Sequence, residues 1–286
     1  MTREAAGPVN PSSPFSQRLW TAAQARGSWV CLGLDVDLAR LPESLPRTLD
    51  GARRFLHDVI DASVDEVVAY KPNLPFYLAL GAGGLELLAD TVRYVSDRAI
   101  VIVDGKFSDV ATTTERYVYT MFEYIGCDAV VINPYGGRDA IAPFLTRPER
   151  GAFVWTRGSN PGADELQGRR MASGDPLFIE VARGAAGWNG LGNVGLVVGA
   201  TRAGDIRDVR AAAPGLPILA PGVGAQGGDL EATVAAGFGQ APAGVLISVG
   251  RSALWASVAA DYAEATRRVL SRTRERIEAV IGQVTA

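Results

Sequence analysis

Histidine and cysteine are scarce in this chain of 286 residues, which contains one histidine, His57, and two cysteines, Cys31 and Cys127. The cysteines lack CxxC or CxxH spacing and lie in apolar, strand-like runs. We therefore expect buried reduced thiols, and neither a zinc site nor a disulfide scaffold. We expect His57, in an amphipathic segment, to be an exposed structural residue. With no other histidine, a Ser-His-Asp triad and a histidine-based metal site are excluded.

Long apolar runs and a strong net charge are also missing. No run approaches the roughly 18 residues that a membrane span needs. Residues 1–13 are polar, lack the apolar centre of a signal peptide and are expected to be flexible. The formal charge of −3 gives no general attraction to nucleic acid or anionic lipid. We therefore expect a cytoplasmic protein with no nucleic-acid or membrane partner, whose anionic ligand, if it has one, is held by a few placed cations and backbone N–H groups.

What the chain does have is a repeated alternation of short apolar runs and helical patterns. Most of the apolar runs are continuous Val/Ile/Leu stretches, which is typical of strands buried on both faces. The eight expected strands are 29–36, 67–74, 99–106, 129–134, 152–156, 194–199, 217–221 and 244–249.

Amphipathic segments lie between these runs and predict helices at 52–64, 84–96, 113–124, 139–145, 176–186, 204–212, 229–236 and 253–281. Eight such units predict an α/β fold, a (β/α)8 TIM barrel formed by residues 1–286 as a single domain. A further N-terminal helix at 14–25 is expected to plug the bottom of the barrel. The polar segment 158–174 is interpreted as an active-site loop after the fifth strand.

Catalytic residues of such barrels lie at the C-terminal ends of the strands. Polar residues at or just past those ends are Asp35, Lys71, Asp104, Lys106, Ser159, Gln226 and Arg251.

The third expected strand carries the most informative charges. With a period of two residues, Asp104 and Lys106 share one face. Lys71 ends the neighbouring strand, and Asp109 follows three residues after Lys106. A structural ion-pair network is one interpretation. Because buried charges are costly unless paired, four alternating charges at neighbouring strand ends favour a catalytic site instead. With no histidine available, a lysine must carry the proton.

A glycine-rich segment follows the seventh expected strand. Residues 222–227 match GxGxxG, but a dinucleotide-binding fold would place this motif after its first strand. The position favours the phosphate site of a barrel, built from the loops after strands seven and eight. There the Gln226 amide and the Gly250 backbone can donate hydrogen bonds, and Arg251 can bind phosphate oxygens bidentately.

These motifs, in this order, resemble the orotidine 5′-phosphate decarboxylase family, in its longer bacterial (type 2) branch. Residues 104–109 look like its DxKxxD signature. The other matching segments are Leu34-Asp35-Val36-Asp37, Tyr70-Lys71-Pro72-Asn73, Ser159-Asn160-Pro161-Gly162, PGVGAQGGD at 221–229 and Val249-Gly250-Arg251-Ser252.

The resemblance implies decarboxylation of orotidine 5′-phosphate to UMP and CO2 in de novo pyrimidine biosynthesis, with no metal and no organic cofactor. It implies that Lys106 protonates a C6 carbanion and that Asp104 lies against the substrate carboxylate. Lys71 would anchor the charges and contact the ribose, and Asp35 would bind a ribose hydroxyl. Ser159 would lie on the pyrimidine side.

The resemblance also implies a homodimer with shared active sites. Asp109, together with Thr113, is expected to reach into the partner's site. Two alternatives remain open. A metal-dependent keto-sugar-phosphate decarboxylase or aldolase of the same superfamily typically has an acidic metal ligand where this chain has Lys71. A non-catalytic nucleotide-binding barrel would not need all four charged residues.

Overall fold

Eight parallel strands close into a barrel in sequence order, with β8 paired to β1. The structure is a computed structural model that describes residues 12–223, 227–240 and 242–285. The strands are β1 Val30–Gly33, β2 Ala69–Lys71, β3 Ile100–Phe107, β4 Ala129–Ile132, β5 Gly151–Arg157, β6 Val194–Val198, β7 Ile218–Pro221 and β8 Val245–Val249. The predicted (β/α)8 barrel is confirmed.

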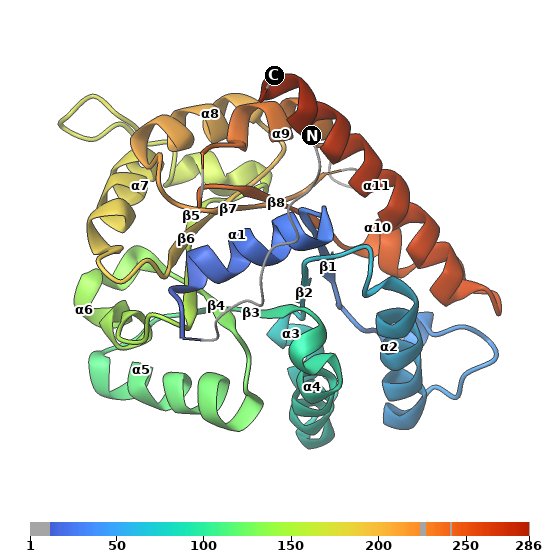
Figure 1. Cartoon of the computed structure of the whole chain (residues 1–286). Helices are drawn as coiled ribbons and strands as arrows, with labels where there is room; N and C mark the ends of the chain where they lie inside the picture. The colour runs from blue at the N-terminus through green and yellow to red at the C-terminus, as the bar shows by residue number, and fades with distance from the viewer. Residues whose placement is uncertain (1–11, 224–226, 241, 286) are drawn as a thin grey trace.

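Helices surround the barrel (Figure 1). The longer ones are α2 Leu49–Ser63, α4 Ala82–Val95, α5 Ala111–Val118, α7 Leu177–Trp188, α8 Ala203–Ala212, α9 Leu230–Gly237 and α11 Tyr262–Val284. Short elements between them are η1 Leu38–Arg40, α3 Leu74–Leu78, η2 Ser96–Arg98, the π-helix η3 Tyr119–Ile125, η4 Pro134–Gly136, α6 Arg138–Ile141, η5 Ala142–Leu145, η6 Pro161–Glu165 and α10 Arg251–Leu254.

Helix α2 shows why these segments fold as they do. Thr48 caps it by accepting a hydrogen bond from the Gly51 N–H at 3.3 Å. Phe55 and Val59, four residues apart, are fully buried on one face of the helix.

The predicted continuous last helix, 253–281, is wrong. The chain forms α10 and then α11, separated by a turn. In that turn Ser257 Oγ donates to Asp261 Oδ1 at 2.7 Å and accepts from the Ala259 N–H at 3.1 Å. Such local side-chain hydrogen bonds compete with helix formation. Trp255 ends α10 and stacks on Phe55 of α2, with ring centroids 4.8 Å apart.

Helix α1, Phe15–Arg26, closes the N-terminal end of the barrel, as the sequence predicted. Its Phe15 N–H donates to Pro148 O, just before β5, at 2.7 Å. The Phe15 ring meets Phe153 of β5 edge to face, with centroids 5.8 Å apart. Figure 1 shows α1 lying across the strands. Most of the segment 1–13 that the sequence predicted to be flexible lies outside the described residues.

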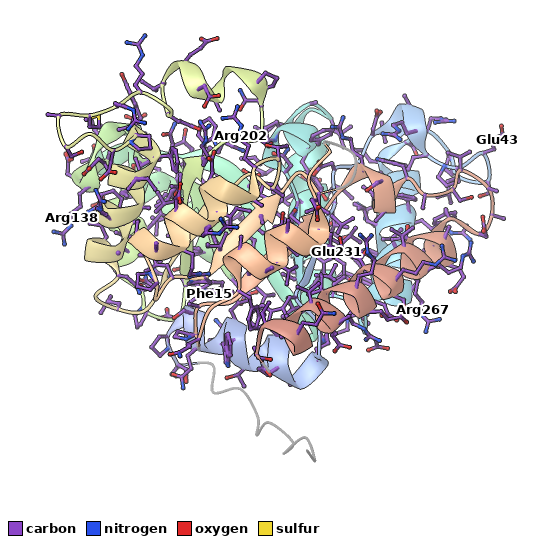
Figure 2. The ribbon with its side chains drawn as sticks, turned by 90° about the horizontal axis from the view of Figure 1, so that it is seen from above. Phe15, Glu43, Arg138, Arg202, Glu231 and Arg267 are labelled. Atoms are coloured by element: carbon purple, nitrogen blue, oxygen red, sulfur yellow. The ribbon has the colours of Figure 1, made fainter. Side chains whose placement is uncertain are left out.

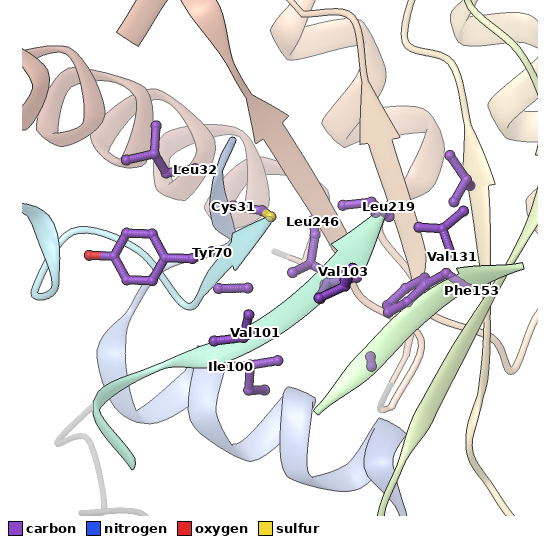
Figure 3. Packing of buried hydrophobic residues seen from close by; sticks show 14 of the residues in the cluster. Cys31, Leu32, Tyr70, Ile100, Val101, Val103, Val131, Phe153, Leu219 and Leu246 are labelled. Atoms are coloured by element: carbon purple, nitrogen blue, oxygen red, sulfur yellow. The ribbon is translucent and has the colours of Figure 1, made fainter. Parts of the chain in front are cut away.

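Apolar side chains from the strands fill the barrel. Figure 3 shows Val131 of β4 beside Phe153 of β5, and the two residues are partners in the barrel register. Gly195 of β6 makes room for the Phe153 ring, because a Cβ atom at Gly195 would lie 2.5 Å from it. The interior is thus a packed core, and ligand space is confined to its ends.

The scarce residues of the sequence take structural positions. Burial raises the pKa of Cys31 and Cys127 to about 12, so both are unreactive thiols, as expected. His57 is more enclosed than predicted: its ring stacks on Tyr94 at 3.5 Å between centroids, and its Nε2 lies 3.2 Å from Asp90 Oδ2. None of the described helices combines the length and the apolar character needed to cross a bilayer.

Candidate active site

A cavity of about 410 Å³ lies at the C-terminal ends of the strands. It is lined by seven of the ten residues that the sequence predicted for the site, namely Asp35, Lys71, Asp104, Lys106, Ser159, Gly250 and Arg251. Gln226 lies outside the described residues. Asp109 and Thr113 are exposed and do not line this cavity.

Asp104 stands between two ammonium groups. Its Oδ1 lies 2.8 Å from Lys106 Nζ, and its Oδ2 lies 3.3 Å from Lys71 Nζ. These two residues are the only lysines in the sequence. The Lys71 side chain is 9% exposed and the Lys106 side chain 39% exposed, so the first is buried and the second reaches the cavity. Of the four charges that the sequence analysis groups at neighbouring strand ends, these three converge in the cavity, and Asp109 does not.

The backbone of β3 departs here from the regular two-residue alternation of side chains that the sequence analysis assumed. The register between β3 and β4 shifts between Asp104 and Phe107, and Lys106 adopts a positive φ of 49°. Gly105 has no side chain to clash with the Phe107 ring, which would lie 2.2 Å from a Cβ atom there. A non-glycine residue in this region of φ is strained, and such strain is concentrated at functional sites.

Burial and charge act in opposite directions on the pKa values of this pair. Burial alone would lower the pKa of Lys71, but Asp104 and Asp35 outweigh it and the pKa is raised. Burial alone would raise the pKa of Asp104, but Lys71 and Lys106 outweigh it and the pKa is lowered. Both groups are therefore held in their charged forms at neutral pH.

Asp35, which follows β1, has the opposite balance. Burial raises the pKa of its carboxyl group, and Lys71 only partly opposes this shift. Its Oδ1 is buried and has no hydrogen-bond partner among the described residues. A buried carboxylate oxygen beside a cavity is suited to accept a hydrogen bond from a ligand hydroxyl.

The opposite side of the cavity is formed by the ends of β7 and β8. Gly222, Val223, Gly250 and Arg251 line it. Gly222 has a φ of 101°, which favours glycine. Arg251 is exposed and forms no ion pair with a described residue. A free guanidinium beside glycine-rich backbone is suited to an anionic group.

Asp109 and Thr113 lie beside the mouth rather than in it. Asp109 Oδ1 accepts a hydrogen bond from the Val110 N–H at 2.7 Å, and its own N–H donates to Thr114 Oγ1 at 3.2 Å. The neighbouring Val110 is 65% exposed. These residues thus stand on an open surface next to the cavity.

Sequence reasoning missed Trp155 and Arg157, which both line the cavity. Trp155 of β5 lies with its ring centroid 5.6 Å from Lys106 Nζ, a cation–π contact. Arg157 ends β5, one residue beyond the predicted end of that strand. Asn73, which the sequence places just after β2, forms a backbone bridge with Asp104. The alternation of Trp155 and Arg157 at a strand end was the signal that could have identified them.

Among the described residues, no three His, Cys, Asp or Glu side chains are grouped as ligands for a metal ion. Lys71, Asp104 and Lys106 are instead paired with one another. The chemistry that this arrangement offers directly is that of an ammonium proton donor beside a carboxylate, with an anion site across the cavity.

Comparison with known proteins finds similarity to one family along nearly the whole chain. Residues 28–267 match the family model described as Orotidine 5′-phosphate decarboxylase / HUMPS family. The orotidine 5′-phosphate decarboxylase of Thermomicrobium roseum is 45% identical over 272 residues, which are 94% of this chain and 97% of the relative. That of Roseiflexus castenholzii is 44% identical, covering 94% and 99%. The solved structure of Leishmania donovani OMP decarboxylase superposes with a TM-score of 0.78 at 32% identity, covering 91% of this chain and 98% of the other.

Proposed function

The chain belongs to the orotidine 5′-phosphate decarboxylase / HUMPS family, and from this membership we infer that it converts orotidine 5′-phosphate to UMP and CO2 in pyrimidine biosynthesis. The observation in the site that best supports this inference is the Asp104 carboxylate held between Lys71 and Lys106. We further propose that the chain acts as a single domain in the cytoplasm.

We propose that Lys106 protonates C6 as CO2 leaves. Loss of CO2 leaves a carbanion with no adjacent carbonyl group to take the electrons, so an ammonium at C6 both stabilises the charge and supplies the proton. Asp104 would lie against the substrate carboxylate, a repulsion that is relieved on decarboxylation. Two charges 4 Å apart are worth roughly 4 kcal/mol at an effective dielectric of 20, or about a thousandfold in rate. The remaining acceleration would come from carbanion stabilisation and from binding the phosphoribosyl part, which does not react.

The other cavity residues bind the unreactive parts of the substrate in this proposal. Asp35 accepts a hydrogen bond from a ribose hydroxyl, and Lys71 contacts the ribose while neutralising the carboxylates. Ser159 lies at the pyrimidine. Gly250, Arg251 and, outside the described residues, Gln226 hold the phosphate.

Turnover of orotidine 5′-phosphate by the purified protein, followed by its loss of absorbance with and without EDTA, tests this function. We expect equal rates in both conditions, because the proposed steps use only side chains of the chain. Loss of activity with EDTA would favour the metal-dependent keto-sugar-phosphate alternative. Binding without turnover would favour the non-catalytic barrel. The relatives named as orotidine 5′-phosphate decarboxylases do not favour either alternative.

Replacing Arg251 by alanine is expected to raise KM much more than it lowers kcat. Its guanidinium is exposed at the cavity and would contact the phosphate, which does not change during the reaction. Charged hydrogen bonds of this kind contribute about 1.5–3 kcal/mol, which corresponds to roughly a tenfold to a hundredfold increase in KM. Steady-state kinetics measures both constants, and a fall in kcat at unchanged KM would show that the phosphate is bound elsewhere.

We also propose that the protein is a homodimer whose active sites are shared. Asp109 and Thr113 stand beside the cavity of their own chain, on a surface with exposed apolar residues: Val110 is 65% exposed and Tyr135, which follows β4, is 81% exposed. An apolar cavity of about 470 Å³ that includes Tyr135 and Leu166 adjoins the active-site cavity at Trp155. Exposed apolar surface of this kind is suited to contact with a second copy.

Mixing two inactive variants tests the sharing. Asp109→Ala and Lys106→Ala subunits are each expected to be nearly inactive alone. A mixed dimer would contain one site with both native residues, so about half of the mixed dimers' sites should be restored. Activity is measured after refolding the two variants together, with differently tagged subunits to isolate the mixed dimer. An isolated mixed dimer without activity would contradict the sharing.

A further inference from the structure

Arg157 is a buried arginine at the edge of the active-site cavity. Its side chain is 4% exposed, and the residue lines the cavity at the end of β5. Its Nε donates to Asp205 Oδ2 at 2.7 Å, and its Nη2 donates to Asp164 Oδ1. Its Nη1 is buried and has no hydrogen-bond partner among the described residues. A buried cation is costly unless it is paired, so this placement calls for a reason.

The two carboxylates belong to different segments. Asp164 lies in η6, in the loop that follows β5, and Asp205 lies in the first turn of α8, which follows β6. Arg202, the residue before α8, donates two further hydrogen bonds to Asp164, at 3.0 and 2.5 Å. Arg157, Asp164, Arg202 and Asp205 form one group with no net charge, here called the Arg157 cluster. It ties the loop after β5 to the start of α8.

This loop carries three residues of the cavity wall, Gly158, Ser159 and Asn160, between Arg157 and Asp164. The base of the loop is fixed by the Gly158 N–H, which donates to Gln167 Oε1 at 2.8 Å. At Gly199, after β6, a Cβ atom would lie 2.8 Å from Ser159 Cα, so the loop is in direct contact with the end of that strand. Figure 2 shows Arg202 on the side of the barrel opposite Phe15 of α1, so the cluster lies at the mouth.

We propose that Arg157 is a positioning residue for the decarboxylation: through Asp164 it holds the loop after β5 so that Ser159 and Asn160 face the substrate. This proposal rests on the proposed function. The cluster can act in this way because the planar Arg157 guanidinium donates hydrogen bonds both to Asp164 of the loop and to Asp205 of α8. These two bonds fix the position of the loop relative to α8. A lysine at the same place could not supply two donors in the same plane.

Asp164→Asn tests the proposal with little risk to folding. The Asp164 side chain is 47% exposed, and Asp205 still pairs with Arg157 when Asp164 is changed. We expect kcat/KM for orotidine 5′-phosphate to fall about tenfold, within the loss that a small misplacement of a binding group causes. The inhibition constant of UMP should rise in the same way. That of ribose 5-phosphate should not change, because it occupies only the ribose and phosphate end.

Arg183→Gln is the matched control. Arg183 pairs with Asp175 at 2.6 Å on the surface of α7 and does not line the cavity, so its loss should leave all these constants unchanged. Arg202→Gln removes the other arginine that binds Asp164. It should lower kcat/KM in the same direction as Asp164→Asn does. Arg157→Lys should do so as well.

A double-mutant cycle separates positioning from a general structural effect. If Asp164 acts through Ser159 and Asn160, Asp164→Asn should have almost no further effect on kcat/KM in a Ser159→Ala, Asn160→Ala background. The proposal would be overturned if Asp164→Asn lowered kcat/KM by the same factor in this background as in the wild type. It would also be overturned if Asp164→Asn and Arg202→Gln both had wild-type kinetics. In either case, turnover by the wild-type protein would leave the proposed function standing. Absence of wild-type turnover in the same assay would overturn the proposed function and, with it, this inference.

Discussion

Replacing Lys106 by alanine is expected to abolish turnover while the protein stays folded. The lysine is the proposed proton donor and also the cation nearest the developing charge, so its loss removes two contributions at once. A positioned general acid alone contributes about 10² to 10⁴ in rate, and we expect kcat to fall by at least the upper value. The side chain is 39% exposed and Asp104 keeps Lys71 as a partner, so the melting temperature should change little.

Lys106→Arg separates the two contributions. Arginine retains the positive charge but does not release a proton at accessible pH, so this variant should remain inactive while binding UMP better than Lys106→Ala does. Single-turnover kinetics and calorimetric UMP binding measure the two effects. Near wild-type turnover by Lys106→Ala would refute the proton-donor role.

Replacing Lys71 by methionine is expected to cost both activity and stability. Lys71 is buried and is the cation next to Asp104 and Asp35. Removing one partner of a buried charge network costs about 3–5 kcal/mol, because the remaining carboxylates are left without compensation. For a chain of this size each kcal/mol lowers the melting temperature by roughly 2–4 °C, so a fall of about 10 °C is expected.

A second substitution and a change of pH test this explanation. Asp35→Asn in the Lys71→Met background should restore part of the stability, because Asp35 is then the carboxylate without a partner. The pKa of Asp35 is already raised in the folded chain, so folding takes up a proton there, and acidification favours the folded state. The difference in melting temperature between Lys71→Met and wild type should therefore shrink from about pH 7 to about pH 5. A difference that does not depend on pH or on Asp35 would point to packing instead.

The fold could be predicted because a barrel of this kind repeats one simple pattern eight times. Each strand is buried on both faces and so appears as a continuous apolar run. The error at the C-terminus had a local cause. The apolar spacing around Trp255 continues into the next helix, but Ser257 and Asp261 stabilise a turn that periodicity does not register.

The site could be predicted where a charged residue ends an apolar strand, as with Lys71 and Asp104. It could not be predicted where the backbone departs from regular geometry. Lys106 reaches Asp104 through a register shift and a positive φ. Neither feature can be predicted from the alternation of side chains along a strand. Arg157 was missed because its importance depends on Asp164 of η6 and Asp205 of α8, which lie far apart in the sequence and meet only in the folded barrel.

The scarcity of lysine gives direct chemical access to both amines of the site. Reductive methylation with ¹³C-formaldehyde modifies amines and not guanidinium groups, so side-chain labelling would be confined to Lys71 and Lys106. Each would give its own NMR signal beside that of the N-terminal amine, and the order in which the two lysines react would distinguish them. Lys106 should react first because it is more exposed, and a bound nucleotide should protect it. The titration of each signal would then report the protonation state of one amine at a time during binding.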